Sequence, residues 1–152
     1  MIQPISTPSA PAALGPYSQA IRAGQFLFVS GQVPIDPATG NLVTGTIADQ
    51  ARRALQNVGE ILKAGGSSFS QVVRTTVYLA DLADFPAMNE VYAEYFTETP
   101  PARSTIQAGG LPHGILVQIG CIAIVPSAIQ SIQVIEARES ESHYNLDLDW
   151  DI

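Results

Sequence analysis

Two stretches of the chain place hydrophobic residues at helical spacing between residues that favour helix ends. The first begins at Thr46, whose hydroxyl can accept a backbone N–H, and Asp49 three residues on completes an approximate capping box. The stretch ends at Gly65-Gly66. Its hydrophobic positions share one face: Ile47, Ala51, Ala54, Leu55, Val58 and Leu62. The pattern predicts a one-sided helix lying on a sheet.

The second helical stretch starts at Asp84, which we expect to cap it, and closes before Pro100-Pro101. Its hydrophobic positions are also spaced for one buried face: Phe85, Met88, Val91, Tyr92 and Tyr95. Two one-sided helices are therefore expected.

The remaining hydrophobic stretches are short, rich in β-branched residues and bounded by turn residues, which predicts strands. The expected strands cover residues 2–6, 20–22, 26–30, 71–79 and 115–125, with another apolar strand starting at Arg103. A tight turn at residues 23–25 makes the second and third strands a hairpin, and residues 36–41 form a further turn. Residues 7–16 contain three prolines and must be a surface loop.

This order of elements predicts an α+β fold with two helices on one face of a mixed sheet. No third helix remains to cover the other face. Charged residues are only 14% of the chain, which is low for a small domain and suggests that apolar surface is covered by other subunits. We therefore expect an oligomer.

Charge divides the chain into residues 1–126, the expected domain, and a C-terminal extension, residues 127–152. The extension has six acidic residues against Arg138, a net of −5 out of the total of −7. Residues 128–134 are compatible with one more strand of the sheet. Residues 145–152 alternate acidic with apolar side chains, which fits either an added strand or a docking peptide for a protein partner.

Composition also limits the partners and the compartment. The chain has no basic patch, so nucleic acid is not an expected partner. Its single cysteine, Cys121, suits a reducing compartment. No signal-peptide pattern and no membrane-length apolar run is present. These features predict a cytoplasmic protein without membrane association.

The clearest candidate for chemistry is Arg103, because a guanidinium among few other charges can bind a small carboxylate through two parallel hydrogen bonds. A structural interpretation instead makes it an ion-pair residue between subunits. Cys121 shares a strand face with apolar neighbours, so we expect an inert core thiol. The chain has only two histidines, His113 and His143, which with one cysteine make no metal site.

Four short motifs follow one another along the chain: residues 10–20 (APAALGPYSQA), 29–32 (VSGQ), 50–53 (QARR) and 101–104 (PARS). Together they resemble the Rid family (RidA, also called YjgF), the reactive-intermediate deaminases, over roughly the first 126 residues. The resemblance implies a chorismate-mutase-like fold, a homotrimer, and an active site in each cleft between subunits. It also implies cofactor-free hydrolysis of 2-imino acids, formed from enamines released by pyridoxal-phosphate enzymes, to 2-oxo acids and ammonia.

The resemblance also implies roles for individual residues. Arg103 would hold the substrate carboxylate, and the backbone at Thr105 would contact the substrate and the attacking water. Tyr17 would line the pocket, with three further residues close by: Ser30, Gly31 and Asn89. An imine carbon is already electrophilic, so a site needs little beyond an anchor and a held water.

The chain departs from the family pattern at three positions. Deaminating members place a glutamate on the last strand to position the water, and Gln118 stands there; Gly120 replaces a second acidic residue, and Thr105 replaces a cysteine. Glutamine can orient water but cannot accept its proton, which costs about 10²–10⁴ in rate if the carboxylate is a base.

Two functional interpretations therefore stay open. One is a 2-imino acid deaminase that uses Arg103 and a water held by Gln118. The other is a non-catalytic protein of the same fold that binds a small carboxylate and, through its acidic extension, a protein partner. A ribonuclease activity is a weaker third interpretation because the chain has no basic groove.

Overall fold

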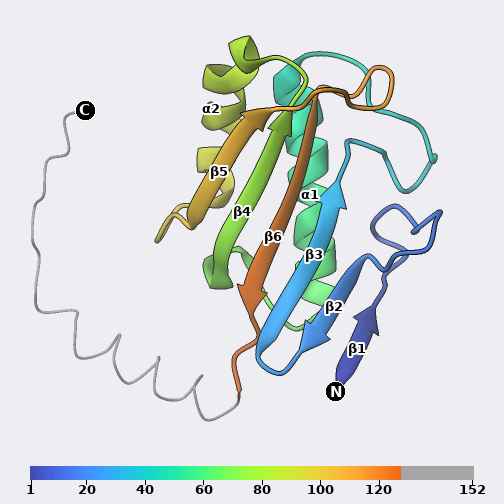
Figure 1. Cartoon of the computed structure of the whole chain (residues 1–152), viewed down its shortest axis with the longest axis vertical. Coiled ribbons are helices and arrows are strands. Elements are labelled where there is room, and N and C mark those ends of the chain that lie inside the picture. Colours follow the sequence, from blue (N-terminus) through green and yellow to red (C-terminus); the bar gives the residue numbers. More distant parts are fainter. Residues whose placement is uncertain (128–152) are drawn as a thin grey trace, which may run out of the picture.

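The computed structural model of the chain describes residues 1–127, which form a mixed sheet with two helices packed behind it in the view of Figure 1. Residues 128–134, which were compatible with one more strand, and residues 145–152, which fitted either an added strand or a docking peptide, lie outside the described residues. The boundary proposed between residues 126 and 127 stays a prediction.

The sheet has the strand order β1-β2-β3-β6-β4-β5. Its strands are β1 (Ile2–Ile5), β2 (Ala20–Ala23), β3 (Phe26–Gln32), β4 (Val72–Leu79), β5 (Ala102–Gln107) and β6 (Val117–Ile124). Neighbouring strands are antiparallel except β4 and β5, which are parallel. The predicted mixed α+β architecture is confirmed.

Helix α1 (Ile47–Ala64) has the predicted N-terminus, with both halves of the capping box present. The Asp49 backbone N–H donates to Thr46 Oγ1 (3.3 Å), and the Thr46 backbone N–H donates to Asp49 Oδ2 (3.0 Å). The Thr46 backbone N–H and the Thr46 hydroxyl both donate to the Asp49 carboxylate, and these two bonds hold the pKa of the Asp49 carboxyl below its ordinary value. Within residues 1–127, no helix is long and apolar enough to cross a bilayer.

Helix α2 (Phe85–Tyr95) starts where predicted, but the expected capping by Asp84 is wrong. Asp84 has helical backbone angles (φ −80°, ψ −4°), whereas a capping side chain requires an extended backbone. The capping side chain is that of Asp81, which caps the preceding 3₁₀ turn η2 (Leu82–Asp84) and not α2 itself. Its carboxylate accepts the Ala83 N–H (2.9 Å). A second 3₁₀ turn, η1 (Phe69–Gln71), precedes β4.

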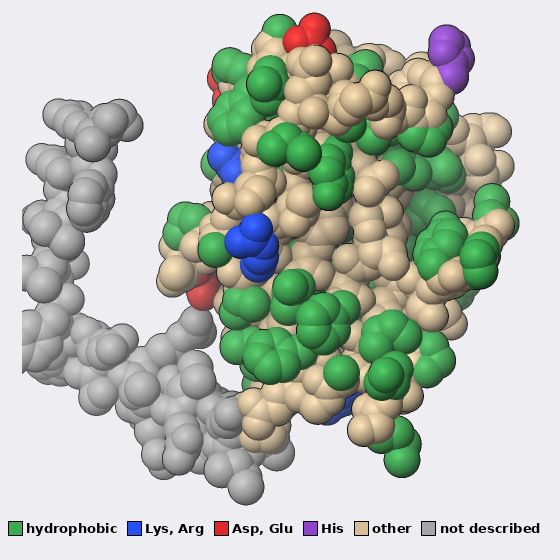
Figure 2. Space-filling view, in the orientation of Figure 1, with side chains coloured by type: hydrophobic (Ala, Val, Ile, Leu, Met, Phe, Trp, Pro, Cys, Tyr) green, Lys and Arg blue, Asp and Glu red, His purple; other side chains and the backbone are tan. Residues whose placement is uncertain are grey.

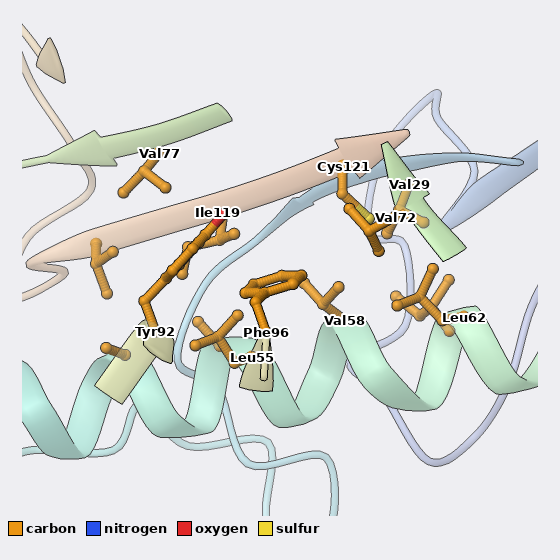
Figure 3. Close-up of a cluster of buried hydrophobic side chains, with 14 of the residues drawn as sticks. Val29, Leu55, Val58, Leu62, Val72, Val77, Tyr92, Phe96, Ile119 and Cys121 are labelled. Carbon is orange, nitrogen blue, oxygen red and sulfur yellow. The ribbon is translucent and has the colours of Figure 1, made fainter. Parts of the chain in front are cut away.

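The core lies between the helices and one face of the sheet, where side chains from α1 and α2 meet those of β3, β4 and β6 (Figure 3). These three strands contribute largely alternate residues to it. On β6 the buried positions are Val117, Ile119, Cys121 and Ala123, so the expected core position of Cys121 is confirmed. In the predicted stripe of α2, Phe85 and Tyr95 are only partly buried.

The opposite face, here called the open face, has no helix over it within residues 1–127 (Figure 1). Figure 2 shows hydrophobic side chains gathered on this face over the lower half of the sheet. Phe26 and Phe28 project there with 47% and 44% of their surface exposed. Exposed aromatic side chains gathered in this way are typical of a surface that another protein covers.

Two strand predictions need correction. The last strand begins at Val117 rather than Ile115, because the Leu116 N–H donates to Gln50 Oε1 (2.8 Å) on α1 instead of to a neighbouring strand. The strand that starts near Arg103 is not apolar. Its sequence, ARSTIQ, is mostly polar and only partly buried because β5 lies at the sheet edge.

Asn57 is a fully buried polar residue that ties α1 to the loop after β3. Its amide N–H groups donate to the carbonyls of Val33 (3.1 Å) and Ile35 (2.9 Å). We predict that Asn57→Ala lowers the free energy of unfolding by about 2–3 kcal/mol, because buried acceptors lose their donor. Urea unfolding followed by circular dichroism measures this. Gln56→Ala, the exposed amide beside it, should change stability little; equal effects would contradict the account.

Candidate functional site

Arg103 lies on β5 with its side chain on the helix-covered side of the sheet, because it is in register with the buried Thr75 of β4. Its Nη1 donates to Asn89 Oδ1 on α2 (2.8 Å). The guanidinium carbon is 4.6 Å from the centroid of the Tyr92 ring and 5.3 Å from that of Phe85. Both distances are within the range of cation–π attraction. All three contacting side chains are uncharged.

The three contacting residues come from one stripe of α2, since Phe85, Asn89 and Tyr92 are spaced by four and three residues. The Tyr92 hydroxyl hydrogen bonds with that of Thr75 (2.7 Å). Burial raises the pKa of Tyr92 above its ordinary value, so the ring stays neutral at physiological pH. The helix thus presents one amide and two aromatic rings to the arginine.

A cavity of about 550 Å³ opens beside this arginine. Its lining comes from α2 and its C-terminal cap, from the turn before β5 and from β5 itself: Asn89, Tyr92, Ala93, Phe96, Pro100, Pro101 and Arg103. A lining that combines apolar side chains with one amide and one fixed cation suits a small anionic molecule. The cavity therefore supports the interpretation of Arg103 as a carboxylate anchor.

Thr105 follows Arg103 by two positions on β5 and pairs with the buried Val77, so it faces the same side of the sheet. Its hydroxyl oxygen is buried and, among the residues the structure describes, has no hydrogen-bond partner. We call Arg103, Asn89 and Thr105 the Arg103 cluster.

Gln118 lies on the open face, in register with Tyr78 of β4. Its side chain covers Gly31, where a β-carbon would stand only 2.3 Å from Gln118 Nε2. The neighbouring Ser30 donates through its hydroxyl to the Ser18 carbonyl (2.6 Å), which brings in the Tyr17 segment. Gly31 and Gln118 line a cavity of about 260 Å³ on this face. We call Gln118, Gly31 and Ser30 the Gln118 cluster.

Tyr17 is 56% exposed and lines a third cavity, of about 640 Å³, under the N-terminal loop. This cavity is distinct from the one beside Arg103. Tyr17 therefore does not line the Arg103 cavity within one protomer.

The predicted site residues thus form two clusters that one protomer does not bring together. The side chains of Arg103 and Gln118 are on opposite faces of the sheet, and β4 separates their strands. Two strand spacings alone amount to about 10 Å. A site that uses both clusters needs two copies of the chain.

Three residues of the Arg103 environment were not predicted as site residues: Phe85, Tyr92 and Thr75. Phe85 and Tyr92 read as core positions because their spacing is that of a buried helix stripe. Asn89, which the family resemblance had pointed to, falls on the same stripe. A polar amide between aromatic residues is the one sequence signal that could have linked Phe85 and Tyr92 to the site.

The thiol of Cys121 is not part of either cluster. It is buried, and burial raises its pKa to about 12. A thiol with so high a pKa is protonated at physiological pH and is a poor nucleophile. This agrees with its expected role as an inert core residue.

The model of the family described as Endoribonuclease L-PSP matches residues 7–125. A RutC family protein from Pyrococcus horikoshii is 53% identical over 123 residues, covering 81% of this chain and 98% of the relative. The mouse protein named 2-iminobutanoate/2-iminopropanoate deaminase is 51% identical over 120 residues, covering 79% of this chain and 89% of that protein.

The fold also matches solved structures. The crystal structure of the YjgF gene product from E. coli superimposes with a TM-score of 0.78 at 39% identity, covering 82% of this chain and 99% of that one. Agreement over nearly the full length of that structure confirms the expected fold class.

We predict that Cys121 resists alkylation in the folded protein. With its pKa at about 12, the thiolate fraction near pH 8 should be lower than in the unfolded chain by about 10²-fold or more, and iodoacetamide should react more slowly in proportion. The folded rate should still rise with pH between about 8 and 10, while the unfolded rate levels off above the ordinary pKa of 9.0. Mass spectrometry with and without urea measures both rates. Equal rates would contradict the assignment.

Proposed function

The chain belongs to the Rid family, also called YjgF or L-PSP, and on that premise we propose that it is a hydrolytic deaminase of reactive 2-imino acids. Its substrates would be compounds such as 2-iminopropanoate and 2-iminobutanoate, and its products 2-oxo acids and ammonia. Relatives about half identical in sequence are named 2-iminobutanoate/2-iminopropanoate deaminase, including those of mouse and human.

The observation that carries the proposal is the uncharged environment of Arg103. One of its N–H groups is bound to Asn89, and its guanidinium carbon lies over two aromatic rings. No carboxylate takes part in these contacts, so the positive charge stays available for an anionic ligand. A guanidinium has five donors in a fixed fork, which leaves enough for two parallel bonds to a carboxylate.

We propose that the site is completed across a subunit boundary in a homotrimer. The Arg103 cluster of one protomer would face the Gln118 cluster of the next, because neither face alone presents both. The apolar open face, where Gln118 lies, is the surface that the neighbour would cover.

In the proposed reaction Arg103 holds the substrate carboxylate and places the imine carbon near a water molecule. The water oxygen bonds to that carbon while a water proton passes to the imine nitrogen. The resulting hydroxyl proton then moves to the amino group, the C–N bond breaks, and ammonia leaves as the carbonyl forms. Gln118 would orient the water by accepting a hydrogen bond through its amide oxygen.

A second candidate function rests on Gln118 itself. An amide cannot take up a proton, so the same site without catalysis would be a binding cleft for a small carboxylate metabolite. Nucleolytic activity, which the family description suggests, is not favoured because the chain carries a net charge of −7.

We predict that the purified protein accelerates release of 2-oxo acid from freshly generated 2-iminobutanoate. Arg103→Ala should lower kcat/KM by about 10²-fold or more, because the carboxylate loses its bidentate partner. Arg22→Ala, a surface arginine on β2 remote from the proposed site, should leave the rate unchanged. Acceleration that survives Arg103→Ala would contradict the proposal.

Gln118→Glu separates the two candidate functions in the same assay. The enzyme interpretation expects turnover by the native protein and a higher kcat in the variant with little change in KM. Saturable binding of 2-oxobutanoate without turnover by either protein would favour the carboxylate-binding function.

A further inference from the structure

Phe85 and Tyr92 form a support for the Arg103 guanidinium that we call the aromatic seat. The guanidinium carbon lies 4.6 Å from the Tyr92 ring centroid and 5.3 Å from the Phe85 ring centroid. The two rings come from α2 and the arginine from β5, so the seat spans the boundary between helix and sheet. Figure 3 shows Tyr92 pointing from α2 toward the sheet.

The Tyr92 side chain is itself held in place by a hydrogen bond at its hydroxyl and by packing of its ring. Its hydroxyl bonds with Thr75 (2.7 Å), a residue with no exposed surface, and its ring packs against Phe96 with centroids 4.4 Å apart. Thr75 is the strand partner of Arg103. One rung of the β4–β5 ladder therefore carries both the arginine and the group that fixes the ring against which it rests.

The seat does what the Asn89 hydrogen bond alone cannot do. A single bond at Nη1 fixes one corner of the guanidinium but allows its plane to turn. Two ring faces restrict that plane, and an arginine fixed before binding loses less conformational freedom when a ligand arrives. Because the seat is uncharged, it does not neutralise the arginine as a carboxylate partner would.

We propose that the rings of Tyr92 and Phe85 are positioning groups that pre-orient Arg103 for a carboxylate ligand. The inference rests on the proposed function for the identity of the ligand. It goes beyond that function by explaining the affinity for the carboxylate: the aromatic seat, together with the charge of Arg103, determines how tightly the carboxylate is bound. Binding that is equal in ground and transition state changes KM and leaves kcat unchanged.

The test compares Tyr92→Leu, which removes the ring, with Tyr92→Phe, which keeps it. Tyr95→Leu is the matched control, because Tyr95 is on the same helix but packs against Phe69 and not against Arg103. Tyr92→Leu should raise KM for 2-iminobutanoate by about 3- to 30-fold, the size of one partly desolvated cation–π contact, with kcat nearly constant. Tyr92→Phe and Tyr95→Leu should stay near the native value. Phe85→Leu, at a less buried position, repeats the test if Tyr92→Leu does not fold.

A second readout needs no ligand. ¹⁵N relaxation of the Arg103 Nε–H, assigned through Arg103→Lys, reports how ordered the guanidinium is in the free protein. We expect an ordered group in the native protein and in Tyr92→Phe, and a more mobile one in Tyr92→Leu. An Arg103 group that is equally ordered in Tyr92→Leu and Phe85→Leu, or already mobile in the native protein, overturns the proposal whatever happens to KM.

This design separates failure of the seat from failure of the proposed function. If the native protein turns over no imine, the deaminase proposal fails, and NMR titration with 2-oxobutanoate replaces KM as the measure of affinity. Weakened binding and a loosened Arg103 in the ring-deleting variants would still support the seat. If 2-oxobutanoate does not bind to the native protein, the relaxation data alone decide whether the aromatic seat orders Arg103.

Discussion

The parallel pairing of β5 with β4 is the constraint on which the arrangement of the candidate site depends. Parallel strands cannot be joined by a tight turn, so the chain must cross over the sheet between them, and α2 is that crossover. The crossover places the polar and aromatic stripe of α2 directly against Arg103. Edge position leaves β5 accessible on its outer side, so the cation is both supported by the protein and reachable by a ligand.

Alternation along the strands then decides what one protomer can and cannot do. The side chains of Arg103 and Thr105 fall on the helix side, whereas that of Gln118 falls on the open face. No side-chain rotation brings these groups together through a packed sheet. Assembly is therefore part of the proposed chemistry: the apolar open face favours association, and association would bring the two clusters together.

Sequence patterns were sufficient for features that depend on neighbours along the chain. The capping box at Thr46, the buried stripe of α1 and the buried face of β6 with Cys121 follow from local spacing and are confirmed. Tertiary contacts were not predictable in this way. Gln50 takes the N–H of Leu116, 66 residues away, and shortens the last strand. Asp84 was expected to cap α2, but η2 gives it helical backbone angles, which no local pattern revealed.

The residues of the candidate site also differ in whether the sequence alone could identify them. Arg103 stands out in the sequence because cations are rare in this chain and because it follows a proline-fixed turn. Tyr92 and Phe85 do not, since an aromatic residue on a helix stripe has the same pattern whether it fills the core or supports a cation. The position of Arg103 over both rings, which depends on the pairing of β5 with β4, distinguishes the two roles.

The central claim is that Arg103 binds a carboxylate in a site shared between subunits. A crystal structure of the full chain with 2-oxobutanoate tests it most directly. The account predicts carboxylate oxygens within hydrogen-bond distance of the Arg103 guanidinium, with Gln118 of a neighbouring protomer at the keto carbon. A ligand bound elsewhere, or an Arg103 engaged by an acidic side chain of the neighbour, would contradict it.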